Sequence, residues 1–208
     1  MHLPDGIIPL DQAFIYWIIV VICLGIFFYR LSRMEDDQRG RRLVLTAVLA
    51  AATIVVSTIT VPSPLGIPIH FFLIPLVVII LGPFSGTTVI FLALLVQGFI
   101  GHGGLTVLGA NAFVMGTVLG LSAYVAYIII SRFSKTLGVF IGTFLGIIIA
   151  ALAQIILLVI GDVATLETLL PIFTIYYLFI GIIEGFITTL IISFIEKTKP
   201  EILTLQKI

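Results

Sequence analysis

The first two residues of the chain can act together as a metal chelator. A free α-amine on Met1, the deprotonated amide nitrogen of His2 and the His2 imidazole would surround one ion with three nitrogens in a plane. A further imidazole would complete a square-planar set, which suits Ni(II) and Cu(II) but is poor for Mg(II) and Ca(II). His70 and His102 are the only other histidines, so they are the candidates for the fourth ligand.

Plainer roles compete with metal binding at each histidine. His2 would otherwise be an exposed residue at a frayed terminus, and His70 and His102 would be hydrogen-bonded imidazoles at the lipid headgroups. The chelate also needs Met1 to be retained, its formyl group to be removed and no signal peptidase to cut. The bulky His2 favours retention of Met1, and the leader lacks the basic start and small-residue end of a signal peptide.

The composition of the chain is typical of a protein embedded in a lipid bilayer rather than dissolved in water. Hydrophobic residues make up 61% of the 208 residues and charged residues 10%, whereas a soluble domain carries about 25% charged residues. We therefore expect a multi-pass protein of a prokaryotic cell membrane, embedded in the lipid bilayer. A net charge of zero without a broad basic face excludes a nucleic-acid partner. The single cysteine, Cys23, lies in an apolar run and is expected to be a small buried hydrophobe.

Several apolar stretches are long enough to cross a bilayer as helices, and these stretches determine where the histidines lie. A hydrocarbon core of about 30 Å needs about 20 residues of helix. The stretches of this length cover residues 12–31, 43–61, 84–101, 106–130, 137–161 and 169–195. A further candidate, residues 66–82, is shorter and contains Pro75. We predict an all-α polytopic membrane helix bundle, forming one domain over residues 1–208 with a metal-binding segment over residues 1–11.

The positive charges decide how often the chain crosses the membrane. The ten basic residues form three clusters: Arg30, Arg33, Arg39, Arg41 and Arg42; Arg132 and Lys135; and Lys197, Lys199 and Lys207. Seven crossings put all three clusters on one side, in agreement with the excess of Lys and Arg in cytoplasmic loops. We therefore predict about seven transmembrane helices, with the N-terminus outside and the C-terminus in the cytoplasm. The three histidines then share the outer face of the membrane.

Polar and small residues within the spans have more than one interpretation. Asn111 can orient a histidine ligand by a hydrogen bond or join two helices. Glu184 is an ionisable group within a span and so a functional hypothesis by default, either as a neutral packing residue or facing a partner. Small residues favour packing within the bundle over docking of another subunit. They include Ala47, Ala50, Ala51 and Ala52 in one span and Gly138, Gly142 and Gly146 in another.

Three sequence blocks together resemble those of the CbiM/NikM family. They are Met1-His2-Leu3-Pro4-Asp5-Gly6; Ile69-His70-Phe71 with Leu81-Gly82-Pro83; and Gly101-His102-Gly103-Gly104-Leu105-Thr106 with Leu108-Gly109-Ala110-Asn111. Members of this family are the substrate-specific membrane components of energy-coupling-factor (ECF) transporters for cobalt and nickel. The resemblance covers nearly the whole chain. It implies the substrate-binding part of an ATP-driven importer, which performs no covalent chemistry and has no cofactor beyond the transported ion.

The resemblance also implies site residues and partners. The implied metal ligands are Met1, His2 and His70. The residues implied to support these ligands, or to line the path by which the ion enters, are His102, Asn111 and Asp5. The implied partners are an ECF transmembrane coupling subunit, two cytoplasmic ATPase subunits and often a small accessory membrane protein. Ala47 and Ala51 resemble the small-residue strip that meets the coupling subunit.

Nickel is favoured over cobalt, which remains close behind. The Pro-Asp-Gly leader is more similar to the nickel branch, and a square plane with an amide nitrogen suits Ni(II) better than Co(II). Residues 71–75 are bulkier than the Gly-rich run of the family, so the loop near His70 is expected to differ in shape. One alternative is an ECF component for an organic vitamin, which would need a roomy aromatic pocket. The other is an intramembrane hydrolase, but its obvious nucleophile, Ser85, would lie across the membrane from His102.

Overall fold

The chain folds into a bundle of helices, as the sequence predicts. The computed structural model describes residues 3–62, 69–101 and 103–207, and side chains as far as residue 203. The α-helices are α1 (Leu10–Ser32), α2 (Asp36–Thr58), α3 (Ile74–Leu81), α4 (Pro83–Phe99), α5 (Leu108–Ala112), α6 (Leu119–Ile130), α7 (Lys135–Ile160) and α8 (Leu166–Thr198). A π-helical segment, η1 (Phe113–Val118), joins α5 to α6, and a 3-10 segment, η2 (Pro200–Lys207), follows α8. The described residues contain no β-sheet beyond an isolated antiparallel bridge between Val61 and Ile69.

Within the described residues, five helices are long and apolar enough to cross a membrane, counting the run 108–130 as one. The shorter helix α4 is also apolar, with 17 residues. The stretch 66–82 differs from prediction: residues 66–68 lie outside the described residues, and the helix α3 has 8 residues. At 1.5 Å per residue this helix is about 12 Å long, well short of the hydrocarbon core. The count of seven spanning helices is therefore not confirmed.

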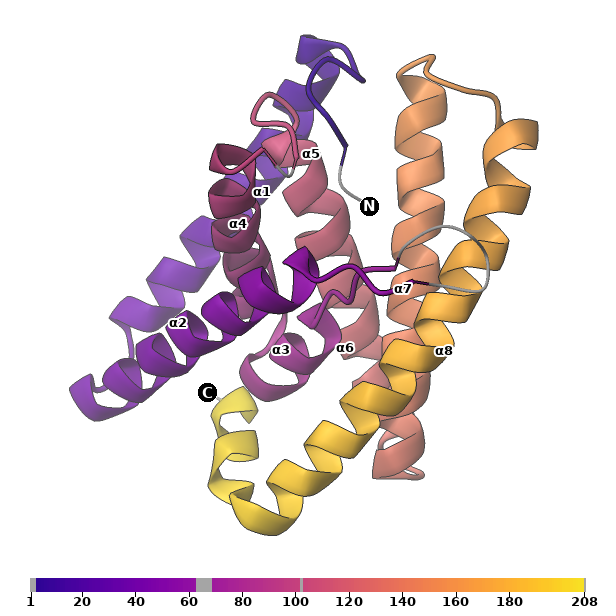
Figure 1. Cartoon of the computed structure of the whole chain (residues 1–208). Coiled ribbons are helices and arrows are strands. Elements are labelled where there is room, and N and C mark those ends of the chain that lie inside the picture. Colours follow the sequence, from indigo (N-terminus) through magenta and orange to yellow (C-terminus); the bar gives the residue numbers. More distant parts are fainter. Residues whose placement is uncertain (1–2, 63–68, 102, 208) are drawn as a thin grey trace.

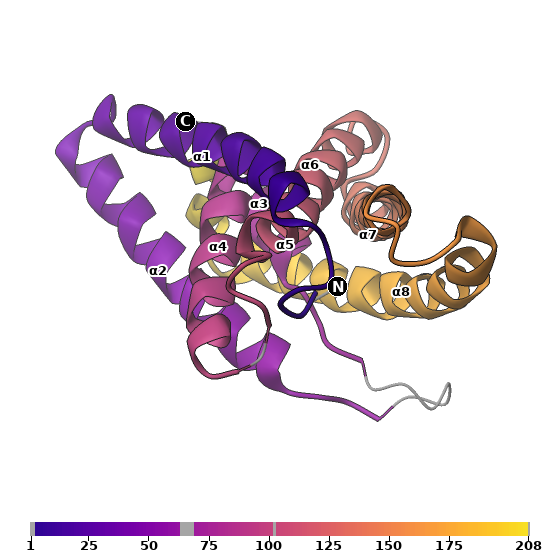
Figure 2. The ribbon, with the colours of Figure 1, turned by 90° about the horizontal axis from the view of Figure 1, so that it is seen from above.

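The short helix α3 lies inside the bundle and leads directly into α4. All eight of its residues are buried, and it packs against α4, α6, α7 and α8 in the middle of the bundle (Figure 2). It ends at Gly82, whose φ of 86° is a conformation that suits glycine, and α4 begins at the next residue, Pro83. This Gly-Pro pair turns the chain sharply, so that α3 leads into the start of α4.

The bundle has two distinct ends (Figure 1). At one end lie the α1–α2 junction, the α6–α7 junction and the end of α8, which contain the basic clusters, and we call it the arginine end. At the other end lie the start of α1, the end of α4 and the α7–α8 junction, and we call it the N-terminal end. The predicted grouping of basic clusters is therefore present. That the arginine end faces the cytoplasm stays a prediction.

The glycines of α7 allow this helix to approach α6 closely. A Cβ atom on Gly142 would come within 2.9 Å of the carbonyl oxygen of Ala123, and one on Gly146 within 2.6 Å of the Ala123 Cβ atom. Such distances are too short for any other residue without movement of the helices. The predicted packing role of these small residues is confirmed for α7.

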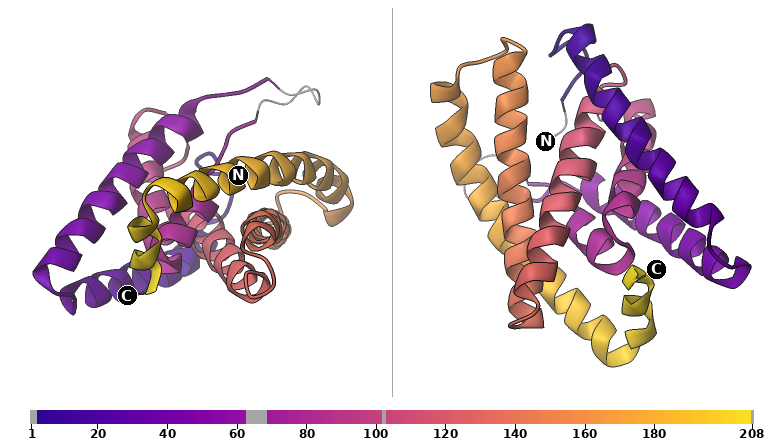
Figure 3. Two further views of the ribbon diagram at one scale, coloured as in Figure 1. Left: turned by 90° about the horizontal axis from the view of Figure 1, so that it is seen from below. Right: turned by 180° about the vertical axis from the view of Figure 1, so that it is seen from behind.

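Helix α2 lies at the edge of the bundle and uses one face only (Figures 2 and 3). Its buried positions include Thr46, Ala50 and Thr53, which recur at helical spacing toward α4. Ala47 and Ala51 each follow a buried position by one residue, about 100° around the helix, and are exposed. The two alanines that the sequence assigns to partner docking are thus not used for packing within the bundle.

Candidate metal site

The N-terminal segment, residues 3–6, is held against the loop and helix that follow α4. Leu3 N donates to Asn111 Oδ1 at 2.9 Å, and Asn111 Nδ2 donates back to Leu3 O at 3.1 Å. Gly104 N donates to the same Leu3 oxygen at 3.1 Å. The Asn111 side chain is 2% exposed, so it satisfies both backbone groups of Leu3 where water cannot. The residue that follows His2 is therefore fixed to α5.

Asp5 forms a second attachment between the same segments. Its Oδ1 accepts hydrogen bonds from Thr106 N at 2.7 Å and from Thr106 Oγ1 at 2.6 Å. The Thr106 hydroxyl, and after it the Thr106 amide, hold the pKa of the Asp5 carboxyl below its usual range. Gly104 permits this contact, because a Cβ atom there would lie 2.5 Å from Asp5 N and 2.7 Å from Asp5 Oδ1. Gly104 thus makes room for the N-terminal segment.

His70 lies in the extended segment that connects α2 to α3. Its Nδ1 is 3.0 Å from the carbonyl oxygen of Ser57, near the end of α2. A carbonyl oxygen only accepts hydrogen bonds, so Nδ1 carries a proton, and in the neutral imidazole the lone pair is then on Nε2. A backbone carbonyl in this position is the usual partner that fixes the tautomer and orientation of a metal-binding histidine. The ring is therefore in the form that a metal ligand requires.

The support of His70 continues into α4 through two polar residues of the apolar spans. Gln97 Nε2 donates to Ser57 Oγ at 2.7 Å, and Ser57 Oγ donates to Thr53 O at 2.5 Å. Gln97 is 1% exposed, and its Oε1 has no hydrogen-bond partner among the described residues. Neither Ser57 nor Gln97 is among the site residues predicted from the sequence. The sequence feature that could have indicated them is a polar side chain within an apolar stretch, because burying such a group is costly unless it is hydrogen-bonded.

The two supports meet at the end of α4. Gly98, next to Gln97, lies under the Leu105 side chain: a Cβ on Gly98 would be 2.5 Å from Leu105 Cδ2. The loop containing Leu105 also supplies Gly104 and Thr106 to the N-terminal segment. Contiguous contacts therefore connect the His70 support, through the end of α4, to the segment that follows His2.

Glu184 holds the backbone directly after His70, a contact that the sequence did not indicate. Its carboxylate accepts hydrogen bonds from Phe72 N at 3.1 Å to both oxygens and from Leu73 N at 2.9 Å. The side chain comes from the middle of α8 and is 2% exposed. The sequence singled out Glu184 as an ionisable group within a span, but its partner was not foreseen.

The predicted ligand set is only partly described. Met1, His2 and His102 lie outside the described residues, whereas His70, Asn111 and Asp5 are within them. Asn111 was expected either to orient a histidine or to join two helices, and the hydrogen bonds described for its amide are to the backbone of Leu3. Among the described residues, no group of three or more His, Cys, Asp or Glu could hold a metal ion.

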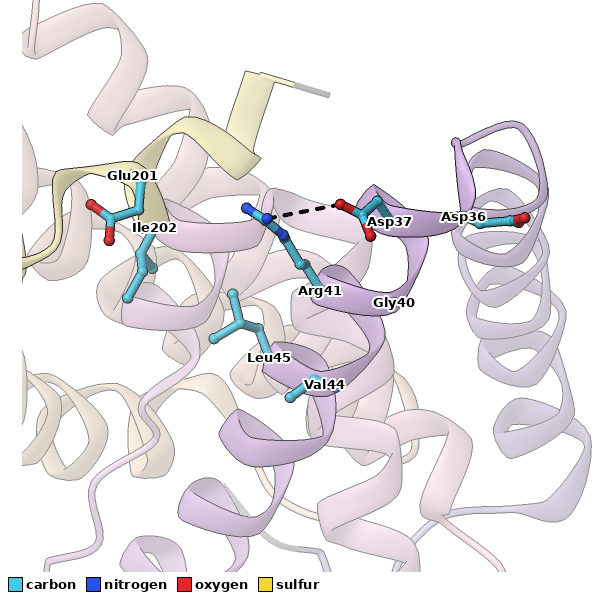
Figure 4. Close-up of a pocket in the computed structure, with 8 residues that line it drawn as sticks. All are labelled: Asp36, Asp37, Gly40, Arg41, Val44, Leu45, Glu201 and Ile202. Carbon is cyan, nitrogen blue, oxygen red and sulfur yellow. Dashed lines mark ion pairs between the residues drawn. The ribbon is translucent and has the colours of Figure 1, made fainter.

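A pocket of about 550 Å³ lies between α2 and η2, at the arginine end of the bundle (Figure 4). It is lined by Asp36, Asp37, Gly40, Arg41, Val44, Leu45, Glu201 and Ile202. Arg41 pairs with Asp37 at 3.8 Å, and both side chains are exposed. The pocket contains no histidine, and it separates the first turns of α2 from η2. It belongs to the outer surface of the bundle rather than to the candidate metal site.

The geometry of Ser85 excludes it as an accessible nucleophile. Its hydroxyl is buried, donates to Leu81 O at 3.0 Å and accepts from Arg42 Nη2 at 3.2 Å. Arg42 Nη2 also donates to Leu81 O. Ser85 thus joins α2 to the turn between α3 and α4, at the arginine end.

Comparison with protein families finds a match over almost the entire chain. The sequence model of the CbiM family, described as "Cobalt uptake substrate-specific transmembrane region", matches residues 2–202. A protein of Archaeoglobus fulgidus, provisionally described as a fused nickel transport protein, NikMN, is 32% identical over 98% of this chain and 68% of its own length. A "Cobalt transport protein CbiM" of Thermosipho melanesiensis is 32% identical over 95% of this chain and 87% of its own.

Solved structures show the same arrangement of helices. A crystal structure of a transition metal transporter aligns with a TM-score of 0.83 and 25% identity, covering 99% of this chain and 97% of the other. A truncated transition metal transporter aligns with a TM-score of 0.82 at 25% identity, covering 95% of this chain and 99% of the other.

Proposed function

This chain belongs to the CbiM family, and we propose that it captures a divalent transition-metal ion, nickel in preference to cobalt, for import by an ATP-driven ECF transporter. It is a multi-pass component of a prokaryotic membrane that serves cobalt or nickel transport, and it is not an enzyme. The metal ion is its transported substrate rather than a resident cofactor.

One observation carries the proposal of an N-terminal metal site: five hydrogen bonds attach Leu3 and Asp5 to residues 104–111. The buried Asn111 side chain and the absence of a Cβ atom at Gly104 both serve to hold this segment in place. Fixing Leu3 limits the positions of the two residues before it, and such preorganisation raises the affinity of a chelating group. The anchored segment therefore supports a function for Met1 and His2.

The ligands in this proposal are the Met1 amine, the His2 amide and imidazole nitrogens, and His70 Nε2. The hydrogen bond from His70 Nδ1 to Ser57 O supports the assignment of Nε2. We assign His102 a supporting role or a place on the entry route of the ion, together with Asp5. Four nitrogens in a plane favour Ni(II), and the similarity to the Archaeoglobus protein is consistent with nickel.

The proposed partners are an ECF transmembrane coupling subunit, two cytoplasmic ATPase subunits and a small accessory membrane protein. The exposed face of α2 supports docking of the coupling subunit through Ala47 and Ala51. These alanines are small enough to let another helix approach closely within the membrane. Val44, one turn before them, lines the pocket of Figure 4, so this face is continuous with that pocket.

Equilibrium dialysis of the purified protein against Ni(II) tests the proposed function. We expect one bound ion per chain, loss of binding in His2→Ala, a large loss of affinity with weak residual binding in His70→Ala, and loss of binding when residues are added before Met1. The same residues added after Ile208 are the matched control and should leave binding unchanged. Ni(II) binding that survives an N-terminal extension would exclude the chelate. Binding of an organic compound that resists a metal chelator would instead favour the vitamin alternative.

A further inference from the structure

Glu184 occupies a position between α8 and the segment that carries His70. The described part of the connection between α2 and α3 extends toward α7 and α8 before α3 begins (Figures 1 and 3). The Glu184 carboxylate meets it at Phe72 and Leu73, two and three residues after His70. Both carboxylate oxygens already accept backbone N–H groups, so the carboxylate is arranged to hold the backbone rather than to bind the ion.

The backbone at this point needs an external support. Leu73 has a φ of 53°, in the left-handed region that is unfavourable for a residue with a branched side chain. Such conformations persist where the surrounding structure imposes them, and they concentrate near functional sites. Leu73 also precedes the first turn of α3, whose N–H groups have no partner within the helix. The Glu184 carboxylate stabilises the backbone just before this helix, since it accepts from Phe72 N and from Leu73 N, at the N-cap of α3.

We propose that Glu184 is a positioning residue for metal binding: it fixes the backbone after His70 and thereby the approach of the imidazole to the ion. Two supports then orient His70, Ser57 O from α2 on the ring and Glu184 from α8 on the backbone. This inference rests on the proposed function, in which His70 is a ligand. It adds α8 to the elements that determine the geometry of the site.

Two substitutions of Glu184 and one control test the inference by Ni(II) titration of the full-length protein. Glu184→Ala removes all of the hydrogen bonds. Glu184→Gln keeps the side-chain volume and one acceptor oxygen but places an amide N–H group against Phe72 N–H. This variant tests the inference if Glu184→Ala does not fold. Loss of such a supporting contact weakens metal affinity about 10- to 100-fold. Thr188→Val, a nearly isosteric change at a buried position one turn further along α8, should leave the affinity unchanged.

The ligand-field absorption of bound Ni(II) separates positioning from general stability, because it depends on the arrangement of the ligands. We expect a changed spectrum in Glu184→Gln and the wild-type spectrum in Thr188→Val. A second comparison uses His70→Ala as the background. If Glu184 acts through His70, adding Glu184→Gln to His70→Ala should not weaken the residual affinity further, whereas a general structural effect would lower it in both backgrounds.

The outcomes distinguish this inference from the proposed function. Wild-type protein that binds no Ni(II), or that binds it equally well without His70, would overturn the proposed function and the inference together. Wild-type protein that needs His70, with unchanged affinity and spectrum in Glu184→Gln and Glu184→Ala, would overturn the inference alone. Equal weakening by Glu184→Gln in both backgrounds would also overturn it.

Discussion

Asn111→Ala removes the side chain that holds Leu3 to α5. The substitution deletes the acceptor of Leu3 N and one of the two donors to Leu3 O. Leu3 O retains the hydrogen bond from Gly104 N, so the carbonyl group stays satisfied. Leu3 is 6% exposed, so its N–H group has little access to water. The main cost of the substitution is therefore one buried N–H group without a partner.

The loss of one hydrogen bond to a buried N–H group gives the free energy by which Asn111→Ala weakens the docking of the N-terminal segment. A buried donor left without a partner costs about 1–3 kcal/mol. If metal binding requires the docked segment, the same free energy is subtracted from binding. Since about 1.4 kcal/mol corresponds to a factor of ten, the Ni(II) affinity should fall about 5- to 150-fold. Asn111→Asp keeps an acceptor for Leu3 N, but it sets a carboxylate oxygen against Leu3 O and buries a charge, so we expect a loss at least as large.

Isothermal titration of the detergent-solubilised protein with Ni(II) measures this difference. The matched control is Thr143→Val on α7, which also removes a buried polar group. The Thr143 hydroxyl is 0% exposed and has no hydrogen-bond partner among the described residues, so its loss should be neutral or slightly stabilising. Unchanged affinity in Asn111→Ala, or an equal loss in Thr143→Val, would refute the link between the anchored segment and metal binding.

The other two predictions concern the attachment of Asp5. Gly104→Ala would place a Cβ atom 2.5 Å from Asp5 N, so the N-terminal segment must move by about 0.9 Å to reach the 3.4 Å of an ordinary contact. Ni(II) titration should therefore show weaker binding. The control Gly25→Ala, whose Cβ atom would have nothing within 4 Å, should bind Ni(II) normally. Because hydrogen bonds from Thr106 lower the pKa of Asp5 in the folded state, the attachment is fully present above the ordinary aspartate pKa of about 3.9 and is lost as pH falls through the lowered pKa. Thr106→Val should raise the pKa of Asp5 toward about 3.9 in a carboxyl-carbon NMR titration, and an unchanged midpoint would contradict the assigned role of the hydroxyl.

Several features of the site follow from residue type and order. The apolar stretches predict the bounds of α1 and α7 to within two residues, since lipid demands a minimum length of apolar helix. The glycine spacing predicts the close packing of α7, because a helix presents every fourth residue on one face. The clustered charges predict which junctions share the arginine end. Each of these inferences needs only neighbours along the chain.

The internal contacts of the site do not follow in this way. Asn111 meets Leu3 across 108 residues, and Glu184 meets Phe72 across 112. Hydropathy indicates that such polar residues need partners, but the partner depends on how helices distant in sequence rotate and slide against each other. The stretch 66–82 fails for the same reason: its hydropathy resembles that of a span, yet α3 is short and buried on all sides by other helices.

Local sequence patterns are enough to predict a membrane helix bundle of the CbiM family, with histidines suited to a transition-metal ion. These properties depend on local composition, helical periodicity and the order of short motifs. The tertiary structure alone decided which groups hold the segments that carry the histidines: Asn111 and Thr106 for the N-terminal segment, and Ser57 and Glu184 for His70. A hydrogen bond requires two groups to meet within about 3 Å, and only the packed arrangement of helices brings such distant residues together.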